Sequence, residues 1–545
     1  MKPLVPLISF TFLLFVFSCH SDTTEDQFVN YPDPGFRPNI LWITCEDITP
    51  SLGCYNDPVA KTPTLDRLAG EGVLYTHAFS VHGVCAPSRH ALITGMYPTS
   101  TGGNNMRTLK TDLPYLPGYS VVLPPEVKCF SEYLRAAGYY CSNNVKTDYQ
   151  FDPPITAWDE NSNQAHWKNR KPGQPFFAIF NFVITHESMI WRKQDDPLLV
   201  DENEVVLPPY YPEHPIVRRD VARKYSNIAE MDIMVGKLLA ELEGAGLMDS
   251  TIIFFYSDHG GPLPRQKREL YDSGLRIPLL IRFPGKHLAG TITNEMVSFV
   301  DFAPTVLSIA EVTIPDYMQG QAFLGKQRSE PRTYIYAGRD RVDTEYDRVR
   351  AVRDERFKYL YNYFPELPYV MDVDYRKQLP MMSVLYEYDS LDKFSEVEKL
   401  WWSKTKPVEE LYDTENDPFE LINLVEDPAY KEKVTELRTA MKNWQEKFGD
   451  MSEIAEMEMV HNWWGGKDSP PATAPVEATW NEDNLVLDCP TKGASMAWQL
   501  CSESVNGHWN LYTSPLEVSR GDSIRALATR IGYLQSSPMV FMHPE

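Results

Sequence analysis

Residues 39–47 read NILWITCED, a continuous apolar run that ends abruptly in two acidic residues. Two later segments repeat this plan: residues 176–187 read FFAIFNFVITHE, and residues 251–260 read TIIFFYSDHG. Uninterrupted apolar runs of this length are typical of central strands in a parallel sheet that is covered on both faces. Such sheets collect ligands at the carboxyl ends of their strands, which is where this chain places acids and histidines.

Amphipathic segments lie between these runs. From Val221 to Leu242 apolar residues recur at helical spacing, and glycines follow as stop signals. The alternation predicts an α/β fold: a large doubly wound mixed, mostly parallel sheet with helices on both faces. After about residue 330, antiparallel strands and a helix to about Phe448 predict a smaller C-terminal α+β subdomain. Short strand-like runs in residues 476–545 predict a terminal small β-sandwich-like module.

The chain has 545 residues, enough for more than one structural unit. It carries 52 basic and 75 acidic residues, a net charge of −23. This balance argues against nucleic-acid binding and against general binding of polyanions. An anionic substrate would therefore need a local positive pocket.

The first residues are typical of an export signal. Lys2 precedes an apolar run from Leu4 to Phe17 that is too short to span a bilayer. Cys19, directly after Ser18, resembles a bacterial lipoprotein cleavage site, and plain secretion is the alternative. We expect an exported bacterial protein, a periplasmic or cell-surface lipoprotein that meets the membrane only through a lipid anchor at Cys19.

Cysteine usage fits an exported protein. Eight cysteines occur, and the compartment permits disulfides. We expect Cys489 and Cys501 to pair, because both lie in one small domain. The sequence contains no CxxC pair, so a zinc–thiolate site is not expected.

The chemistry-bearing motif is CAPSRHALITG at residues 85–95. A helix that begins here would direct free N–H groups and a positive dipole end at an anion. Arg89 adds a planar fork that can hold two oxygens of a sulfate or phosphate. The alternative is a buried structural cysteine before an ordinary helix start. Cys-x-Pro-Ser-Arg with the trailing Thr-Gly resembles the signature of the type I sulfatases of the alkaline phosphatase superfamily.

This resemblance implies a sulfuric ester hydrolase in which a maturation enzyme oxidises Cys85 to formylglycine. In the family, one hydroxyl of the hydrated aldehyde attacks sulfur and the other helps to expel sulfate. The resemblance covers residues 37 to about 450, including LYD at 411–413 and DPFE at 417–420. We expect six segments: signal peptide 1–18, tether 19–36, sulfatase catalytic domain 37–330, C-terminal sulfatase subdomain 331–464, linker 465–475 and accessory β domain 476–545.

The resemblance also implies a divalent metal. The family has paired aspartates after its first strand and Asp-Asn after a later one, where this chain has Glu46-Asp47 and Asp258-His259. The implied ligands are Glu46, Asp47, Cys85, Asp258 and His259, and the metal would polarise a sulfate oxygen. Ca²⁺ is the first choice. Mn²⁺ and Mg²⁺ are alternatives, since histidine is less typical of calcium sites than of manganese or other transition ions. The alternative without a metal is a solvated acidic loop for Glu46-Asp47 and a helix-capping or turn-capping aspartate for Asp258.

Further cations match the family's sulfate pocket. Lys146 stands where the family has Gly-Lys-x-His, although Asp148 replaces the histidine. His186 closes an apolar run where the family has a histidine that faces the leaving group. Lys267 matches the lysine of Lys-Gly-x-x-Tyr, and Arg268 is a competing candidate. A structural histidine and surface lysines are the alternatives.

With Arg89, these groups would surround one anionic sulfate. His186 or Lys267 would then protonate the leaving group, and Asp258 would accept a proton from the diol. We therefore predict hydrolysis of sulfate esters or N-sulfates during polysaccharide or glycosaminoglycan degradation. Residues 43–47, ITCED, faintly resemble the branch that includes heparan sulfate N-sulfatases.

Two other functions stay open. A phosphonate monoester or phosphodiester hydrolase of the same superfamily is favoured by Asp258-His259. A lipoprotein that binds sulfated glycans without cleaving them would keep Cys85 as a thiol.

Overall fold

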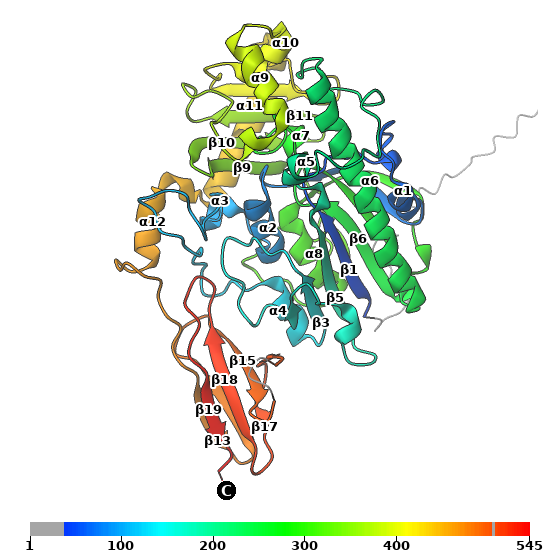
Figure 1. Cartoon of the computed structure of the whole chain (residues 1–545). Coiled ribbons are helices and arrows are strands. Elements are labelled where there is room, and N and C mark those ends of the chain that lie inside the picture. The colour runs from blue at the N-terminus through cyan, green and yellow to red at the C-terminus, as the bar shows by residue number, and fades with distance from the viewer. Residues whose placement is uncertain (1–36, 504–506, 545) are drawn as a thin grey trace, which may run out of the picture.

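The computed structural model describes residues 37–503 and 507–544, and its largest element is an eight-stranded sheet (Figure 1). The strand order is β4-β3-β5-β1-β6-β7-β2-β8. The first five of these run parallel, β7 is antiparallel to β6 and β2, and β8 is parallel to β2. The strands are β1 (Asn39–Cys45), β2 (Val73–Phe79), β3 (Tyr140–Asn144), β4 (Glu160–Asn161), β5 (Phe176–Phe182), β6 (Thr251–Ser257), β7 (Arg276–Arg282) and β8 (Thr291–Ser298). This confirms the predicted mixed, mostly parallel sheet.

Helices cover both faces of this sheet (Figure 1). Side chains alternate along the central strand β1, so each face presents apolar side chains to the helices that cover it. Ile40 and Trp42 pack into one apolar cluster with α2, α4 and α8, whereas Leu41 and Ile43 pack into another with α1, α6 and α9. The bounds are α1 (Pro63–Gly70), α2 (Cys85–Thr94), α3 (Pro98–Thr101), α4 (Phe130–Ala136), α5 (Ser188–Arg192), α6 (Pro215–Gly244), α7 (Asp272–Leu275), α8 (Phe302–Ile309), α9 (Pro380–Ser390), α10 (Glu396–Lys399), α11 (Lys431–Phe448) and α12 (Glu456–Trp463).

A second, four-stranded antiparallel sheet has the order β12-β11-β10-β9. Its strands are β9 (Ile335–Val342), β10 (Glu345–Arg353), β11 (Phe357–Asn362) and β12 (Glu409–Asp413). The helix α11 packs against it and ends at Phe448, where the sequence predicted a helix to end. This part of the chain is the smaller α+β unit of the predicted fold class.

The C-terminal module consists of two small antiparallel sheets, β13-β14-β17 and β16-β15-β18-β19 (Figure 1). The strands are β13 (Glu477–Asn481), β14 (Asn484–Asp488), β15 (Ser495–Leu500), β16 (Asn510–Leu511), β17 (Leu516–Glu517), β18 (Ser523–Thr529) and β19 (Met539–Met542). Leu485, Ile524 and Ala526 lie in the core that the sheets share.

The expected Cys489–Cys501 disulfide is wrong, because both thiols are free. Cys489 follows β14 in one sheet and donates to the Ala474 carbonyl (3.4 Å), whereas Cys501 follows β15 in the other sheet. A disulfide needs Cβ atoms about 3.8 Å apart, which membership of one small domain does not ensure.

The predicted signal peptide, tether and lipid-anchor residue Cys19 lie outside the described residues. Within residues 37–503 and 507–544, no helix combines the length and the apolar content needed to cross a bilayer.

One buried acid on α6 makes stability depend on pH. Asp220 accepts a hydrogen bond from the Met381 N–H (2.7 Å) in the first turn of α9, and burial raises its pKa to about 7. Its unfolded pKa is ~3.9, so its contribution to stability is full below that pH and is lost as pH rises through 7. We expect Asp220→Asn to stabilise the fold by on the order of 2–4 kcal/mol at pH 8, and by less at pH 5.

Thermal unfolding at the two pH values tests this expectation. The asparagine oxygen can still accept the Met381 hydrogen bond, so a change in helix capping does not confound the comparison. An equal change in melting temperature at both pH values would contradict the assignment.

Candidate active site

The carboxyl ends of three neighbouring strands converge on one buried site. Glu46 and Asp47 follow β1, Asp258 and His259 follow β6, and β5 leads through the short helix η4 (Val183–Thr185) to His186. The strands β5, β1 and β6 are adjacent in the sheet, so these side chains meet although they are distant in sequence. The site thus lies at the sheet edge where parallel α/β folds bind ligands.

Cys85 is the first residue of α2, and its side chain points into this cluster. The residue is 2% exposed, and its Sγ lies 3.5 Å from His259 Nε2. Burial, followed by the charge of Asp258, raises the pKa of the Cys85 thiol well above its usual value. The unmodified cysteine is therefore a protonated thiol and a poor nucleophile.

Ser88, also in the motif, has a structural role. Its hydroxyl donates to the Val84 carbonyl (2.8 Å) and lies 2.6 Å from Ser80 Oγ. These contacts tie the turn before α2 to the first turn of the helix. Ser88 thereby fixes where Cys85 points.

Acidic groups gather around Cys85. Candidate ligand atoms of Asp47, Cys85, Asp258 and His259 all lie within 4.8 Å of one another, and Glu46, Asp47, Cys85 and His186 form an overlapping group. Asp47 Oδ1 is 2.9 Å from His259 Nε2. All five residues predicted as metal ligands therefore belong to one of these two groups.

The donor set fits a hard divalent cation. Glu46 Oε1 and Asp47 Oδ1 are buried, and neither receives a hydrogen bond of normal geometry from the described residues. Carboxylate oxygens are the preferred ligands of Ca²⁺ and Mg²⁺, and one imidazole nitrogen widens the choice to Mn²⁺. The residues present are thus compatible with the implied metal.

Cations face the same cluster. Arg89 donates from Nε to Asp258 Oδ2 (3.1 Å) and from Nη1 to Asn181 Oδ1 (2.7 Å). Lys146 Nζ lies 2.7 Å from Glu46 Oε1, and Lys267 Nζ lies 2.5 Å from Asp47 Oδ2. Each of these three cations therefore pairs with one of the three carboxylates of the cluster.

These cations keep the central carboxylates ionised. Burial opposes ionisation of Asp258, yet His259 and Arg89 lower its pKa to about 2. Burial likewise opposes ionisation of Asp47, but Lys267 and His186 hold the pKa of Asp47 well below its usual range. Both groups are anionic at neutral pH and can serve as ligands or as proton acceptors.

His186 presents a proton to the site. The Ser188 N–H donates to His186 Nδ1 (3.2 Å), so the neutral ring carries its proton on Nε2. His186 Nε2 lies 3.9 Å from Glu46 Oε2, on the side of the acidic cluster. Burial and the charge of Lys267 lower the pKa of His186, which favours the neutral ring.

Comparison with known proteins agrees with this geometry. Residues 38–171 and 157–312 match the family model described as Sulfatase. An "Ulvan-active sulfatase" of Formosa agariphila is 44% identical over 92% of this chain and 90% of its own length. The chain belongs to the type I sulfatases of the alkaline phosphatase superfamily. It is a sulfuric ester hydrolase.

Further matches agree with this family. Residues 265–400 of the sulfatase match the model described as N-sulphoglucosamine sulphohydrolase, C-terminal. The human N-sulphoglucosamine sulphohydrolase is 27% identical over 75% of this chain and 90% of its own length. A solved structure described as a 2-O GAG sulfatase shares the fold, with a TM-score of 0.57 and 18% identity, covering 76% of this chain and 94% of that one.

A buried acid that sequence reasoning missed, Glu187, lies beside this cluster in the sulfatase. Glu187 Oε2 and Oε1 accept hydrogen bonds from the Arg268 guanidinium (2.8 and 2.7 Å), and its backbone N–H donates to Asp47 Oδ2 (2.7 Å). Arg268, the competing candidate, thus pairs with Glu187, whereas Lys267 lies between Asp47 (2.5 Å) and Glu187 (3.3 Å). The position of Glu187 directly after His186 was the available signal.

An aromatic and charged wall stands beside His186 in the sulfatase. The Tyr375 ring lies 6.3 Å from the His186 ring and 5.3 Å from Trp191, between ring centres. The Arg107 guanidinium lies 5.1 Å from the centre of the Tyr375 ring and forms an ion pair with Asp343. These residues come from separate loops, so no local sequence pattern marks them.

Proposed function

We propose that this sulfatase removes sulfate groups, as esters or N-sulfates, from sulfated glycans, with formylglycine made from Cys85 as its nucleophile. The observation that carries the proposal is the placement of Cys85 at the start of α2, within 4.8 Å of three prospective metal ligands. The similarity to an ulvan-active sulfatase and to N-sulphoglucosamine sulphohydrolase supports a glycan substrate.

Five residues would hold the metal: Glu46, Asp47, Asp258, His259 and modified Cys85. A bound divalent cation, Ca²⁺ as first choice, would polarise a sulfate oxygen and favour ionisation at residue 85. Asp258 would accept a proton there only as a weak base, since its pKa of about 2 keeps it anionic at neutral pH and suits it better to hold the metal.

The remaining groups bind the sulfate and the leaving group. Arg89, Lys146 and Lys267 are buried or nearly so, and their charges would neutralise a sulfate that has left water. His186 would donate a hydrogen bond from Nε2–H to the bridging oxygen or nitrogen, and so stabilise the negative charge that develops there as the bond to sulfur breaks. Burial of the site excludes bulk water and strengthens each of these interactions.

We further propose export by residues 1–18, lipid attachment at Cys19, and maturation by a formylglycine-generating enzyme. The proposed units are a tether at 19–36, a catalytic domain at 37–330, its subdomain at 331–464, a linker at 465–475 and an accessory β domain at 476–545. The apolar N-terminal run and the Ser18-Cys19 pair support the first two steps.

Mass spectrometry of the tryptic peptide Leu68–Arg89 tests the central claim. Protein from a host with maturation machinery should carry an aldehyde at Cys85 that reacts with a hydrazide. An unmodified thiol under competent maturation would contradict the mechanism and favour a glycan-binding protein.

Hydrolysis of phosphonate monoesters is the second candidate function, because His259 stands where the family has an amide side chain. Rates on sulfate esters and on phosphonate monoesters should be measured in parallel. Faster hydrolysis of the phosphonate would support this second function.

His186→Gln tests the role of His186 at the leaving group. We expect kcat on a sulfated glycan to fall ~10²–10³-fold, the usual cost of removing one hydrogen-bond donor that stabilises a developing anion. The loss should be much smaller for nitrophenyl sulfate, whose nitrophenolate leaving group is already stable as an anion. His461→Gln, at an exposed position on α12, is the matched control and should leave both rates unchanged. Equal losses on the two substrates would assign His186 to binding instead.

A further inference from the structure

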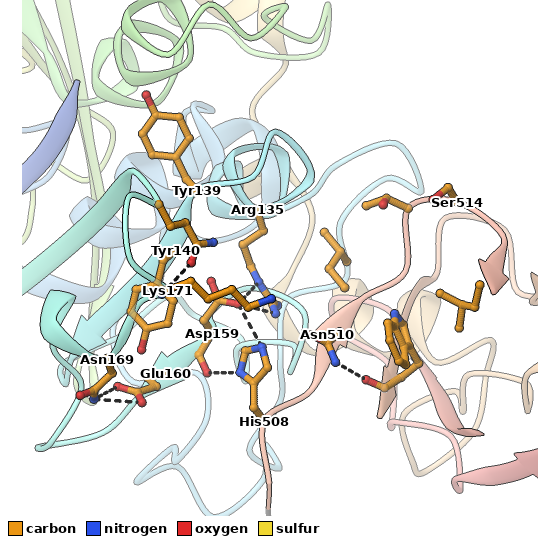
Figure 2. A pocket seen from close by; sticks show the side chains of 15 residues that line it. Arg135, Tyr139, Tyr140, Asp159, Glu160, Asn169, Lys171, His508, Asn510 and Ser514 are labelled. Carbon is orange, nitrogen blue, oxygen red and sulfur yellow. Dashed lines mark hydrogen bonds and ion pairs between the residues drawn. The ribbon is translucent and has the colours of Figure 1, made fainter. Parts of the chain in front are cut away.

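A second cavity lies where the terminal module meets the main domain (Figure 2). Its volume is about 460 Å³, within the ~300–1,000 Å³ range of small-ligand sites. One wall comes from α4, β3, β4 and residues 169–174, and the other comes from β15 and residues 508–516. The cavity is therefore shared between two parts of the chain.

This cavity is separate from the catalytic site. Tyr140 lines the cavity and opens β3, whereas Asn144 ends β3 on the side that leads to Lys146. A strand rises ~3.3 Å per residue, so the two ends of β3 are ~13 Å apart. One sugar residue cannot reach both sites, but a polymer can contact the protein at both.

The walls of the cavity are fixed by direct bonds. Arg135 pairs with Asp159 (2.9 Å) and donates to the Trp509 carbonyl (2.8 Å). Lys128 Nζ donates to the Gly493 carbonyl (2.6 Å) of the module. A Cβ at Gly493 would come 2.1 Å from the carbonyl oxygen of Pro125, so the backbones are in close contact. A preformed cavity loses little entropy when it binds a ligand.

Other polar groups at the cavity do not take part in these contacts between the walls. Among the described residues, Lys171 Nζ makes no hydrogen bond or ion pair, and the Thr513 and Ser514 hydroxyls make no hydrogen bond. Trp498 lines the cavity from the module side, and its half-buried ring provides an apolar surface. The nearby Glu160 carboxylate is engaged by Asn169 Nδ2 at 2.8 and 3.0 Å.

We propose that this cavity binds a sulfated polysaccharide at a non-catalytic site. Trp498 packs against the C–H face of a sugar ring, the hydroxyls of Thr513 and Ser514 bind sugar hydroxyls, and Lys171 contacts a sulfate. The choice of a sulfated glycan rests on the proposed function. Attachment here raises the local concentration of sulfate groups at the catalytic site without any change in catalytic groups.

Native affinity electrophoresis in gels containing ulvan tests this site. The full chain with Cys85→Ala is used, so that the polysaccharide is not consumed. We expect Lys171→Glu, which reverses the charge, and Ser514→Trp, which fills the cavity, each to weaken retardation at least fivefold. Lys492→Glu places the same charge change on an exposed module residue outside the lining and should be retarded like the parent protein.

Turnover separates this inference from the proposed function. In the enzyme with Cys85 intact, Lys171→Glu should raise KM for polymeric ulvan and leave the kinetics on an ulvan disaccharide unchanged. Equal retardation of all four proteins, or equal retardation by desulfated ulvan, would overturn the inference. Failure of the proposed function would instead abolish turnover in every protein and leave the difference in retardation intact.

Discussion

Cys85→Ala is expected to lower kcat by more than ~10⁴-fold while the protein keeps its fold and its affinity for sulfated glycan. The alanine cannot become formylglycine, and no other described nucleophile lies at the start of α2 within the acidic cluster. The Cβ remains, so the packing of α2 changes little. Steady-state turnover and equilibrium binding of the same substrate give the two readouts.

Cys54→Ala is the matched control. Cys54 lies in the short helix η2 (Gly53–Tyr55), and it belongs to neither of the two ligand groups around Cys85. We expect its turnover to remain within about twofold of the parent enzyme, because Cys54 is half-buried at the edge of an apolar cluster and alanine removes only its sulfur atom. Residual turnover of Cys85→Ala near the parent level would locate the nucleophile elsewhere.

The sheet could be predicted from the sequence because its central strands are buried on both faces. The run at 39–45 contains no charged residue, and its acids begin where the strand ends. That coincidence of hydrophobic and polar boundaries also predicted that Glu46, Asp258 and His186 would gather at one sheet edge. Long-range contacts follow here from strand order, which the α/β pattern constrains.

Choices between neighbouring residues could not be made in this way. Lys267 and Arg268 are adjacent, and only the path of their loop decides which one meets Asp47. Arg268 has a positive φ of 78°, and its side chain pairs with Glu187, 81 positions away in the sequence. Backbone turns of this kind depend on tertiary packing and leave little local signal.

The cavity between the terminal module and the main domain and the absence of the expected disulfide have the same cause. The disulfide depends on how the two sheets of the module pack on each other, and the cavity depends on how the module packs on the main domain. Sequence periodicity reports only which face of a strand is buried. Cys489 and Cys501 therefore looked alike in the sequence although they follow strands of different sheets.

Asp47→Asn is expected to lower kcat/KM by ~10³-fold or more and to reduce bound divalent metal. Asp47 accepts from the Glu187 N–H (2.7 Å) and faces Lys267 Nζ (2.5 Å) with Oδ2, while Oδ1 faces His259 Nε2 (2.9 Å). An amide removes one negative charge and turns an NH₂ group toward one of these positive or donor groups. Buried Lys267 would then lose its nearest counter-charge, which would weaken metal binding and change the orientation of the Lys267 ammonium group.

Metal analysis of the purified proteins, together with turnover, distinguishes this role from simple destabilisation. Asp57→Asn is the matched control, because Asp57 also accepts backbone hydrogen bonds, from Val59 and Ala60, but lies outside the ligand groups. A sharp drop in melting temperature would show that Asp47→Asn acts by unfolding the protein. Asp47→Glu keeps the negative charge, so in that case this second variant should retain part of the bound metal. Full metal content in both Asp47 variants would remove Asp47 from the ligand set, since a neutral or displaced group at the centre of the cluster cannot leave metal affinity unchanged.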